Sequence, residues 1–227
     1  PPSVGTGLTA LVTMNIAILG GTGKEGSGLA TRWALAGHSI IIGSRGPERA
    51  EAKATELRER THKLPIIGES NAEAARRGAV VVLALPALGL AATLPEVREG
   101  CRGKVVVSTV VPLTFGGPRL FTPPAAGSSA EEAQALLPEA RVVAAFHHVA
   151  AHELADTDHP IECDLRFCGD DTEAKQTVAE LATSLGLRTI DVGPLSNAAA
   201  LEGITAVLAS INRRYKLKNS GIKITGL

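Results

Sequence analysis

The chain has 227 residues, of which 44% are hydrophobic, and it carries 23 basic and 23 acidic side chains. This balance of charge argues against a dedicated nucleic-acid or acidic-membrane surface. An aromatic content of 3% argues against a platform on which bases stack. The length suits one large domain, or a main domain with a smaller one.

Neither the start of the chain nor its cysteines point to secretion. Residues 1–13 lack the basic start and long apolar stretch of a signal peptide, and the only methionine is Met14. We therefore expect residues 1–13 to be an extension outside the fold of a cytoplasmic protein. Three cysteines at spacings that match no metal or redox motif predict reduced, buried thiols; they are Cys101, Cys163 and Cys168.

Apolar runs alternate with helical patterns, which predicts an α/β fold with a Rossmann-type, doubly wound parallel sheet. Strands are expected over residues 15–19, 39–43, 65–67, 79–85, 104–109 and 141–146. Helices are expected before Gly37, over 47–60, from Ser70 to Gly78, after Pro86, and from Ser128 to Leu137. The long Gly- and Pro-rich loop over residues 110–127 predicts the edge of a ligand site.

The pattern after His147 predicts a smaller α/β portion. Strands are expected over 164–168 and 188–192, with one helix ending at Gly186 and another capped by Ser196 that reaches about Arg213. We therefore divide the chain into a dinucleotide-binding domain, residues 14–147, and a smaller C-terminal domain, residues 148–227.

A glycine cluster follows the first predicted strand, where Gly21, Gly23 and Gly26 form the pattern G-x-G-x-x-G. A strand before it and a helix after it give the setting in which this pattern binds a dinucleotide. We expect Gly21 to allow the tight turn, Gly23 to admit a pyrophosphate, and Gly26 to let helix and strand pack closely. The N–H groups of the helix start then face the anion. The alternative, a turn without a ligand, is disfavoured by this context.

Ser44 and Arg45 stand at the end of the second predicted strand, where a carboxylate commonly holds the ribose of NAD. A hydroxyl and a guanidinium suit a 2′-phosphate instead, which predicts NADP as the cofactor. Arg49, one helical turn further along, either adds a second charge to this phosphate or is a solvated helix arginine.

His147 and His148 are the titratable candidates at the strand ends where a nicotinamide is expected. None of these ends carries a Ser-Lys, Tyr-Lys or Asp-His arrangement. The pair allows three interpretations: a general acid or base, a metal site of His148 with His152, or a wall against a flat ligand. We favour the wall, because no orienting carboxylate lies nearby in the sequence.

Two further groups of charged residues have a structural and a functional interpretation. Asp170 and Asp171 resemble paired catalytic carboxylates, but they precede a predicted helix, so capping is favoured. The basic C-terminal end is either a solvated terminus or a site for an anionic ligand tail; it comprises Arg213, Arg214, Lys216, Lys218 and Lys223.

Several short motifs follow one another in a family-specific order. They are Leu19-Gly-Gly-Thr-Gly23, Gly43-Ser-Arg45, Pro86 at a strand end, Val110-Val-Pro112, Cys168-Gly-Asp-Asp171, Gly193-Pro-Leu-Ser-Asn197 and Gly221-Ile-Lys223. From Met14 to the C-terminus, the chain thereby resembles the F420-dependent NADP oxidoreductases. The resemblance implies hydride exchange between NADP(H) and the deazaflavin coenzyme F420, in a cleft between the two domains of a homodimer.

The resemblance also implies a set of site residues. The NADP set comprises Gly21, Thr22, Gly23, Lys24, Glu25 and Gly26 at the pyrophosphate, Ser44, Arg45 and Arg49 at the 2′-phosphate, and Leu85, Pro86, Gly89, Val111, Ala151 and Ser220 at the nicotinamide half. The deazaflavin set comprises Pro112, His147 and Val149. After His147 the family often has Thr-Ile-Pro-Ala, whereas this chain has His148-Val-Ala-Ala151.

A hydride passes from carbon to carbon between two stacked rings, so the resemblance implies no essential acid or base and no metal. His147 is the best candidate for a catalytic side chain. Two rival functions remain open at this stage: an NADPH-dependent imine or keto-acid reductase, and a non-catalytic NADP-binding sensor.

Overall fold

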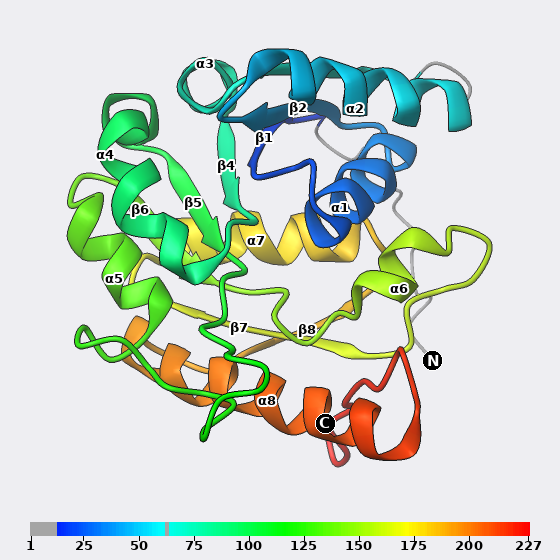
Figure 1. Ribbon diagram of the computed structural model, residues 1–227, viewed down its shortest axis with the longest axis vertical. Coiled ribbons are helices and arrows are strands. Elements are labelled where there is room, and N and C mark those ends of the chain that lie inside the picture. The colour runs from blue at the N-terminus through cyan, green and yellow to red at the C-terminus, as the bar shows by residue number, and fades with distance from the viewer. Residues whose placement is uncertain (1–12, 62–63) are drawn as a thin grey trace, which may run out of the picture.

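The computed structural model describes residues 13–61 and 64–227, so most of the expected extension, residues 1–12, lies outside the described residues (Figure 1). The described strands form an eight-stranded sheet in the order β3-β2-β1-β4-β5-β6-β7-β8. The strands are β1 (Asn15–Leu19), β2 (Ser39–Ser44), β3 (Ile66–Ser70), β4 (Val80–Leu83), β5 (Val105–Ser108), β6 (Arg141–Ala144), β7 (Asp164–Gly169) and β8 (Arg188–Asp191).

Helices separate most of these strands in the chain. They are α1 (Lys24–Leu35), α2 (Pro47–Arg60), α3 (Asn71–Arg77), α4 (Leu90–Cys101), α5 (Ser129–Leu136), α6 (Ala151–Ala155), α7 (Thr172–Thr183) and α8 (Ala198–Tyr215). Two short 3-10 turns, η1 (Ala87–Gly89) and η2 (Leu195–Asn197), precede α4 and α8. None of the described helices is both long and apolar enough to cross a membrane.

The strand order reverses between β1 and β4, and this reversal determines where a ligand can bind. The chain proceeds outward from β1 to β2 and β3, and then returns to the other side of β1 with β4. Both neighbours pair with β1 in parallel, so the carboxyl ends of β1, β2 and β4 lie at one edge of the sheet. A crevice at this switch point is the usual ligand site of an open α/β sheet.

The strands expected to form a parallel sheet, β1 to β6, are parallel, and the strand direction changes only after β6. β7 pairs antiparallel with β6, and β8 pairs parallel with β7. The segment between β6 and β7 contains only the short helix α6. In an antiparallel pair the second strand begins at the edge of the sheet where the first one ends, so the chain needs no crossover helix there. The change of strand direction falls in the connection over residues 145–163, which contains the expected division between residues 147 and 148.

Two apolar clusters cover the two faces of the sheet. One contains side chains of α1, α2 and α7, including Trp33, Leu57 and Val178. The other contains side chains of α3, α4, α5 and α8, including Leu94 and Leu201. In Figure 1, α4 and α5 lie on one side of the fold, and α1 and α6 on the other. Cover on both faces explains the continuous apolar runs in the strands.

Most predicted helix starts are confirmed, and one is wrong. The side chains of Ser70, Ser128 and Asp171 accept hydrogen bonds from N–H groups in the first turns of α3, α5 and α7. Ser196 does not cap the last helix: it lies inside η2, and α8 begins only at Ala198. The tight 3-10 turn uses three residues before the α-helical geometry begins.

The three cysteines are free and buried, as predicted. Burial raises the pKa of Cys101 and Cys163 to about 11 and that of Cys168 to about 12. These thiols are therefore protonated and unreactive at neutral pH.

A buried carboxyl joins α8 to α5. The two oxygens of Glu202 accept hydrogen bonds from the N–H groups of Ser129 (3.0 Å) and Ala130 (3.1 Å), at the start of α5. Burial raises the pKa of Glu202 to about 7. Both N–H groups are buried too, so they depend on this acceptor.

We expect Glu202→Ala to lower the free energy of unfolding by about 2–6 kcal/mol, because each unpaired buried N–H costs about 1–3 kcal/mol. Urea unfolding of the purified variant measures this loss. Glu99→Ala, at an exposed position of α4, is the control and is expected to change stability by less than about 0.5 kcal/mol. An equally small change for Glu202→Ala would show that water satisfies both N–H groups.

Candidate active site

Two adjoining cavities open at the carboxyl ends of β1, β2, β4 and β5. The first has a volume of about 800 Å³ and the second about 510 Å³. Four residues line both cavities, Glu25, Leu85, Pro86 and Leu88. The cavities therefore meet at the start of α1 and at the segment that follows β4.

The glycine turn lies against neighbouring backbone, which explains why side chains are absent there. Gly20 has φ +76°, and a Cβ on it would lie 2.5 Å from the Ala84 carbonyl oxygen. A Cβ on Gly26 would lie 2.7 Å from the Cα of Gly21. The close approach predicted for Gly26 is thus present, whereas the left-handed turn lies at Gly20, one residue before the expected Gly21.

The start of α1 offers a site for an anion. Gly23 is its N-cap and provides no side-chain hydrogen bond to the first turn. A Cβ added to Gly23 would lie no closer than 3.5 Å to another residue, so the space in front of this N-terminus is open. Free N–H groups and the helix dipole both favour a negative charge there.

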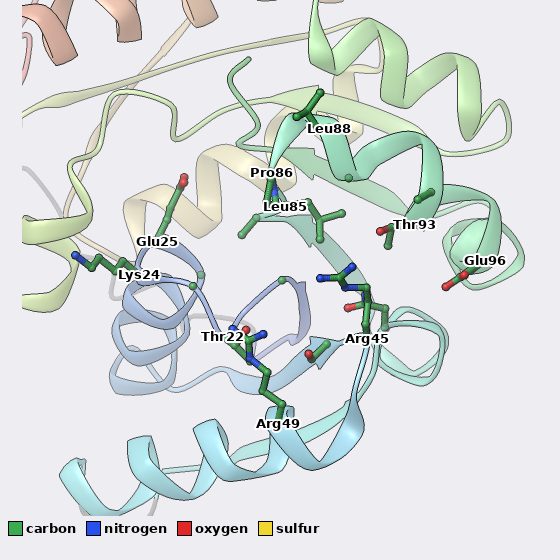
Figure 2. Close-up of a pocket in the computed structure, with 18 residues that line it drawn as sticks. Thr22, Lys24, Glu25, Arg45, Arg49, Leu85, Pro86, Leu88, Thr93 and Glu96 are labelled. Carbon is green, nitrogen blue, oxygen red and sulfur yellow. The ribbon is translucent and has the colours of Figure 1, made fainter. Parts of the chain in front are cut away.

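The end of β2 supplies the hydroxyl and guanidinium groups of the first cavity. Ser44 is buried at the strand end, and Arg45 and Arg49 are exposed at the rim. Figure 2 shows both arginines extending toward the cavity, while Lys24 points away from them. The Oδ1 atom of Asn71, also in the lining, is buried without a hydrogen-bond partner among the described residues. A buried acceptor normally has a hydrogen-bond donor, so we expect a ligand or a water molecule to donate to this oxygen.

The second cavity is mainly apolar and borders the predicted ligand-edge loop. Its lining includes Val111 and Pro112 from this loop, Val149 and Ala151 near α6, and His147. The loop folds back on itself, with a bridge between Leu113 and Phe121 and a hydrogen bond from the Thr114 N–H to the Leu120 carbonyl. Its packing beside the cavity supports the prediction of a ligand edge.

His147 lines this cavity and follows a residue with an uncommon backbone conformation. Phe146 adopts φ +68°, an uncommon conformation for a non-glycine residue, and its buried ring meets Trp33 edge to face at 5.3 Å. Strain of this kind persists where packing fixes the residue, often beside a functional site. Burial, with a smaller effect of His148, lowers the pKa of His147 to about 3. The ring is neutral at pH 7, and neither nitrogen has a partner among the described residues.

His148 instead belongs to a buried hydrogen-bond network. Its Nε2 lies 2.7 Å from the Leu201 carbonyl oxygen, and its Nδ1 accepts a hydrogen bond from Arg166 Nε at 3.3 Å. Because a carbonyl can only accept, Nε2 carries the proton. Both nitrogens are used, so a metal site with His152 is incompatible with this geometry, and of the histidine pair only His147 lines the cavity.

Asp171 and Asp170 have structural partners. Asp171 caps α7 through the Ala174 N–H at 2.7 Å, and Asp170 accepts from the Leu195 N–H at 2.9 Å. The favoured capping interpretation is thus confirmed for Asp171, while Asp170 fixes the Gly-Pro-Leu-Ser-Asn segment.

The other predicted residues divide into two groups. All remaining members of the NADP and deazaflavin sets line one or both cavities, except Gly21 and Ser220. Ser220 donates hydrogen bonds to the Leu208 carbonyl and to Asn212 Oδ1, both on α8. Of the basic C-terminal residues, Arg213 and Arg214 line a separate cavity of about 600 Å³ beside Phe115.

Comparisons with known proteins identify the family. A family model described as NADP oxidoreductase coenzyme F420-dependent matches residues 15–112. The F420-dependent NADP reductases of Methanocaldococcus jannaschii and Methanothermobacter marburgensis are 44% and 40% identical to the chain, each over 94% of the chain and 99% of the relative. The chain belongs to the F420-dependent NADP oxidoreductases. The resemblance and the enzyme class are thus confirmed.

A solved structure supports the same assignment for the fold. The crystal structure of a putative F420-dependent NADP-reductase from Arthrobacter superposes with a TM-score of 0.82, at 28% identity, and covers 94% of this chain and 100% of the other. The Rossmann-type α/β fold class is therefore confirmed, with a mostly parallel sheet.

Some residues of this oxidoreductase site were missed by sequence reasoning. Thr109 and Thr205 line the second cavity and Asn71 the first, and all three come from elements without a binding motif. Position at the carboxyl end of β5 is a sequence signal for Thr109, because ligands of this fold bind at strand ends. Thr205 lies in the middle of α8, and no sequence pattern indicates it.

We expect His147→Ala to slow hydride transfer or weaken deazaflavin binding by about one to two orders of magnitude, short of the 10²–10⁴-fold loss typical of a general acid or base. A neutral wall residue contributes contact and one hydrogen bond. Steady-state kinetics between pH 5 and 8 measure the effect, and no inflection from His147 is expected there because its pKa lies near 3.

The control for this experiment is His152→Ala, an exposed histidine on α6 that lies outside the two cavities. It is expected to leave turnover within about twofold. Activity abolished by His147→Ala, together with the loss of a single-proton inflection near neutral pH, would identify His147 as a catalytic acid.

Proposed function

We propose that this enzyme transfers a hydride reversibly between NADP(H) in the first cavity and the deazaflavin ring of coenzyme F420 in the second, without an essential acid or base. The observation that supports the proposal is that the two adjoining cavities are lined by different kinds of side chain. Anion-binding features are confined to the first, and the second is mainly apolar. The two meet at Leu85 and Pro86.

The residues of the first cavity fit a nicotinamide dinucleotide with a 2′-phosphate. An uncapped helix start faces open space at Gly23, which suits the pyrophosphate. The Ser44 hydroxyl and the Arg45 guanidinium stand at the end of β2 for the 2′-phosphate, with Arg49 one turn into α2. Neither position 44 nor position 45, where NAD-binding proteins commonly have an acidic residue, carries a carboxylate that would repel this phosphate.

The residues of the second cavity fit a flat, uncharged ring. Val111 and Pro112 supply one wall, and Val149 and Ala151 supply another. His147 offers one donor and one acceptor, because its neutral ring has no other partner among the described residues. The small side chain of Ala151 leaves room for a ring in this cavity.

Within such a site the chain binds both cofactors, orients their rings and excludes water. When bound, NADPH supplies the hydride and the deazaflavin accepts it. Holding two rings at the required separation is worth several kcal/mol, because it replaces a random encounter by a fixed geometry. No side chain needs to move a proton for this carbon-to-carbon step.

We further propose that residues 14–147 hold NADP and that residues 148–227 close the deazaflavin cleft and form the interface of a homodimer in the cytoplasm. Val149, Ala151 and Thr205, which line the second cavity, support a C-terminal contribution. Buried free thiols suit a reducing compartment. Light scattering of the purified protein tests the dimer.

The decisive experiment mixes the enzyme with NADPH and oxidised F420 and follows the deazaflavin absorbance. The proposal predicts its loss without any other substrate, and its return with reduced F420 and NADP⁺. An imine or keto-acid reductase would consume NADPH only when its carbonyl or imine substrate is added. A binding sensor would show NADPH affinity without turnover under either condition.

A further inference from the structure

The side chain of Glu25 extends away from Thr22, near the helix start where the pyrophosphate is proposed to bind (Figure 2). It starts at the first turn of α1 and lines both cavities. In Figure 2 its carboxyl extends from α1 away from Thr22 and Arg49. If NADP(H) and the deazaflavin bind as proposed above, this carboxyl lies at the junction where the nicotinamide must reach the second cavity.

The hydrogen bonds around Glu25 fit a carboxyl that can hold a proton. Glu25 is hydrogen-bonded to the hydroxyl of Thr109. That hydroxyl has one hydrogen, and its Oγ1 also lies 3.1 Å from the Leu83 carbonyl oxygen, which can only accept. With the Thr109 hydrogen directed to Leu83, a protonated Glu25 donates to Thr109 Oγ1. An ionised Glu25 draws the same hydrogen to itself, while Leu83 keeps the Thr109 N–H as donor at 3.3 Å.

The other charged side chains that line the two cavities do not affect the pKa of the Glu25 carboxyl. Burial is the main cause that raises the pKa of Glu25 to about 7, and the Thr109 hydrogen bond opposes it. The other titratable or charged residues that line the two cavities are Lys24 on α1, Arg45 and Arg49 at the end of β2 and on α2, Glu96 on α4, and His147 after β6. None of them contributes to the shift. His147 stays neutral because its pKa is about 3.

The two oxidation states of the cofactor differ in charge at one place. The nicotinamide ring of NADP⁺ is cationic and that of NADPH is neutral, whereas their phosphates are the same. We propose that Glu25 determines redox-state specificity: as a carboxylate it favours the cationic ring of NADP⁺, and as a neutral acid it favours the ring of NADPH. At low pH the site then binds NADPH more tightly relative to NADP⁺, and at high pH it binds NADP⁺ more tightly relative to NADPH.

Calorimetry tests this with the dissociation constants of NADP⁺ and NADPH, measured without F420 at about pH 5.5 and about pH 8.5. The ratio of the two constants, NADP⁺ over NADPH, is expected to fall about tenfold between these values, the equivalent of one pKa unit. Titration of the 2′-phosphate, whose pKa is about 6, cancels in the ratio because both forms carry it. Binding of NADP⁺ near pH 7 is also expected to release more protons than binding of NADPH, seen as a stronger dependence of the enthalpy on the buffer.

Glu25→Gln keeps the size of the side chain but cannot ionise. Its ratio is expected to be independent of pH and to match that of the unchanged protein at the acid end. Glu96→Gln is the matched control, because Glu96 lines only the first cavity; it should keep the pH dependence. A ratio that changes less than about twofold in the unchanged protein, or equally in Glu25→Gln, overturns the inference. Failure of both cofactor forms to bind contradicts the proposed function and this inference together.

Discussion

Arg45→Ala is expected to raise the Michaelis constant for NADPH about ten- to a hundredfold, with little change for NADH. The loss of a charge-assisted contact to a phosphate typically costs about 1.5–3 kcal/mol. NADH lacks the 2′-phosphate, so the substitution removes no phosphate contact from it. Initial rates with both nucleotides, at saturating F420, measure the difference.

The exposed position of Arg45 makes the interpretation of this variant simple, because its removal leaves no buried partner unpaired. Arg98→Ala is the matched control: Arg98 is an exposed cation on α4 and lines neither cavity. It should change neither Michaelis constant by more than about threefold. An equal loss for NADPH and NADH after Arg45→Ala would place the arginine at a group that both nucleotides share.

The sequence predicted the elements well where local chemistry determines them. Pro47 at the first position of α2, and the serine caps of α3 and α5, depend only on residues within one turn. The first cavity was predictable for the same reason, because Gly23, Ser44 and Arg45 lie in short motifs of known geometry. The start of α8 was misplaced at Ser196, because this serine resembles a helix cap in the sequence but lies inside a 3-10 turn.

The rest depends on contacts between distant parts of the chain. The antiparallel pairing of β6 with β7 follows from a connection without a crossover helix, which composition does not reveal. The different environments of His147 and His148 depend on distant contacts, because His148 is hydrogen-bonded to Leu201, 53 residues further along the chain, whereas His147 lines a cavity and has no such partner among the described residues. Likewise, the raised pKa of Glu25 results from burial by segments that meet only in the folded protein, opposed by a hydrogen bond with Thr109.

Ala151→Leu is expected to leave NADP binding near normal and to reduce turnover at least about a hundredfold. Ala151 is the first residue of α6 and lines the second cavity only. Leucine adds three carbon atoms at the place where the two rings are proposed to stack. Hydride transfer requires the reacting carbons about 3–3.5 Å apart, and a displacement of about 1 Å can cost a factor of 100. The fold should tolerate the change, because the side chain projects into a cavity.

Two measurements on this variant separate binding from chemistry. Calorimetry gives the affinity for NADP⁺, which rests mainly on the helix start at Gly23 and on Arg45, both in the other cavity. The deazaflavin absorbance with NADPH gives the turnover. Ala155→Leu, the same substitution at an exposed position of α6 outside both cavities, is the control and should keep both values. Near-normal turnover in Ala151→Leu would mean that this residue does not face the stacked rings, and the C-terminal wall of the site would have to be reassigned.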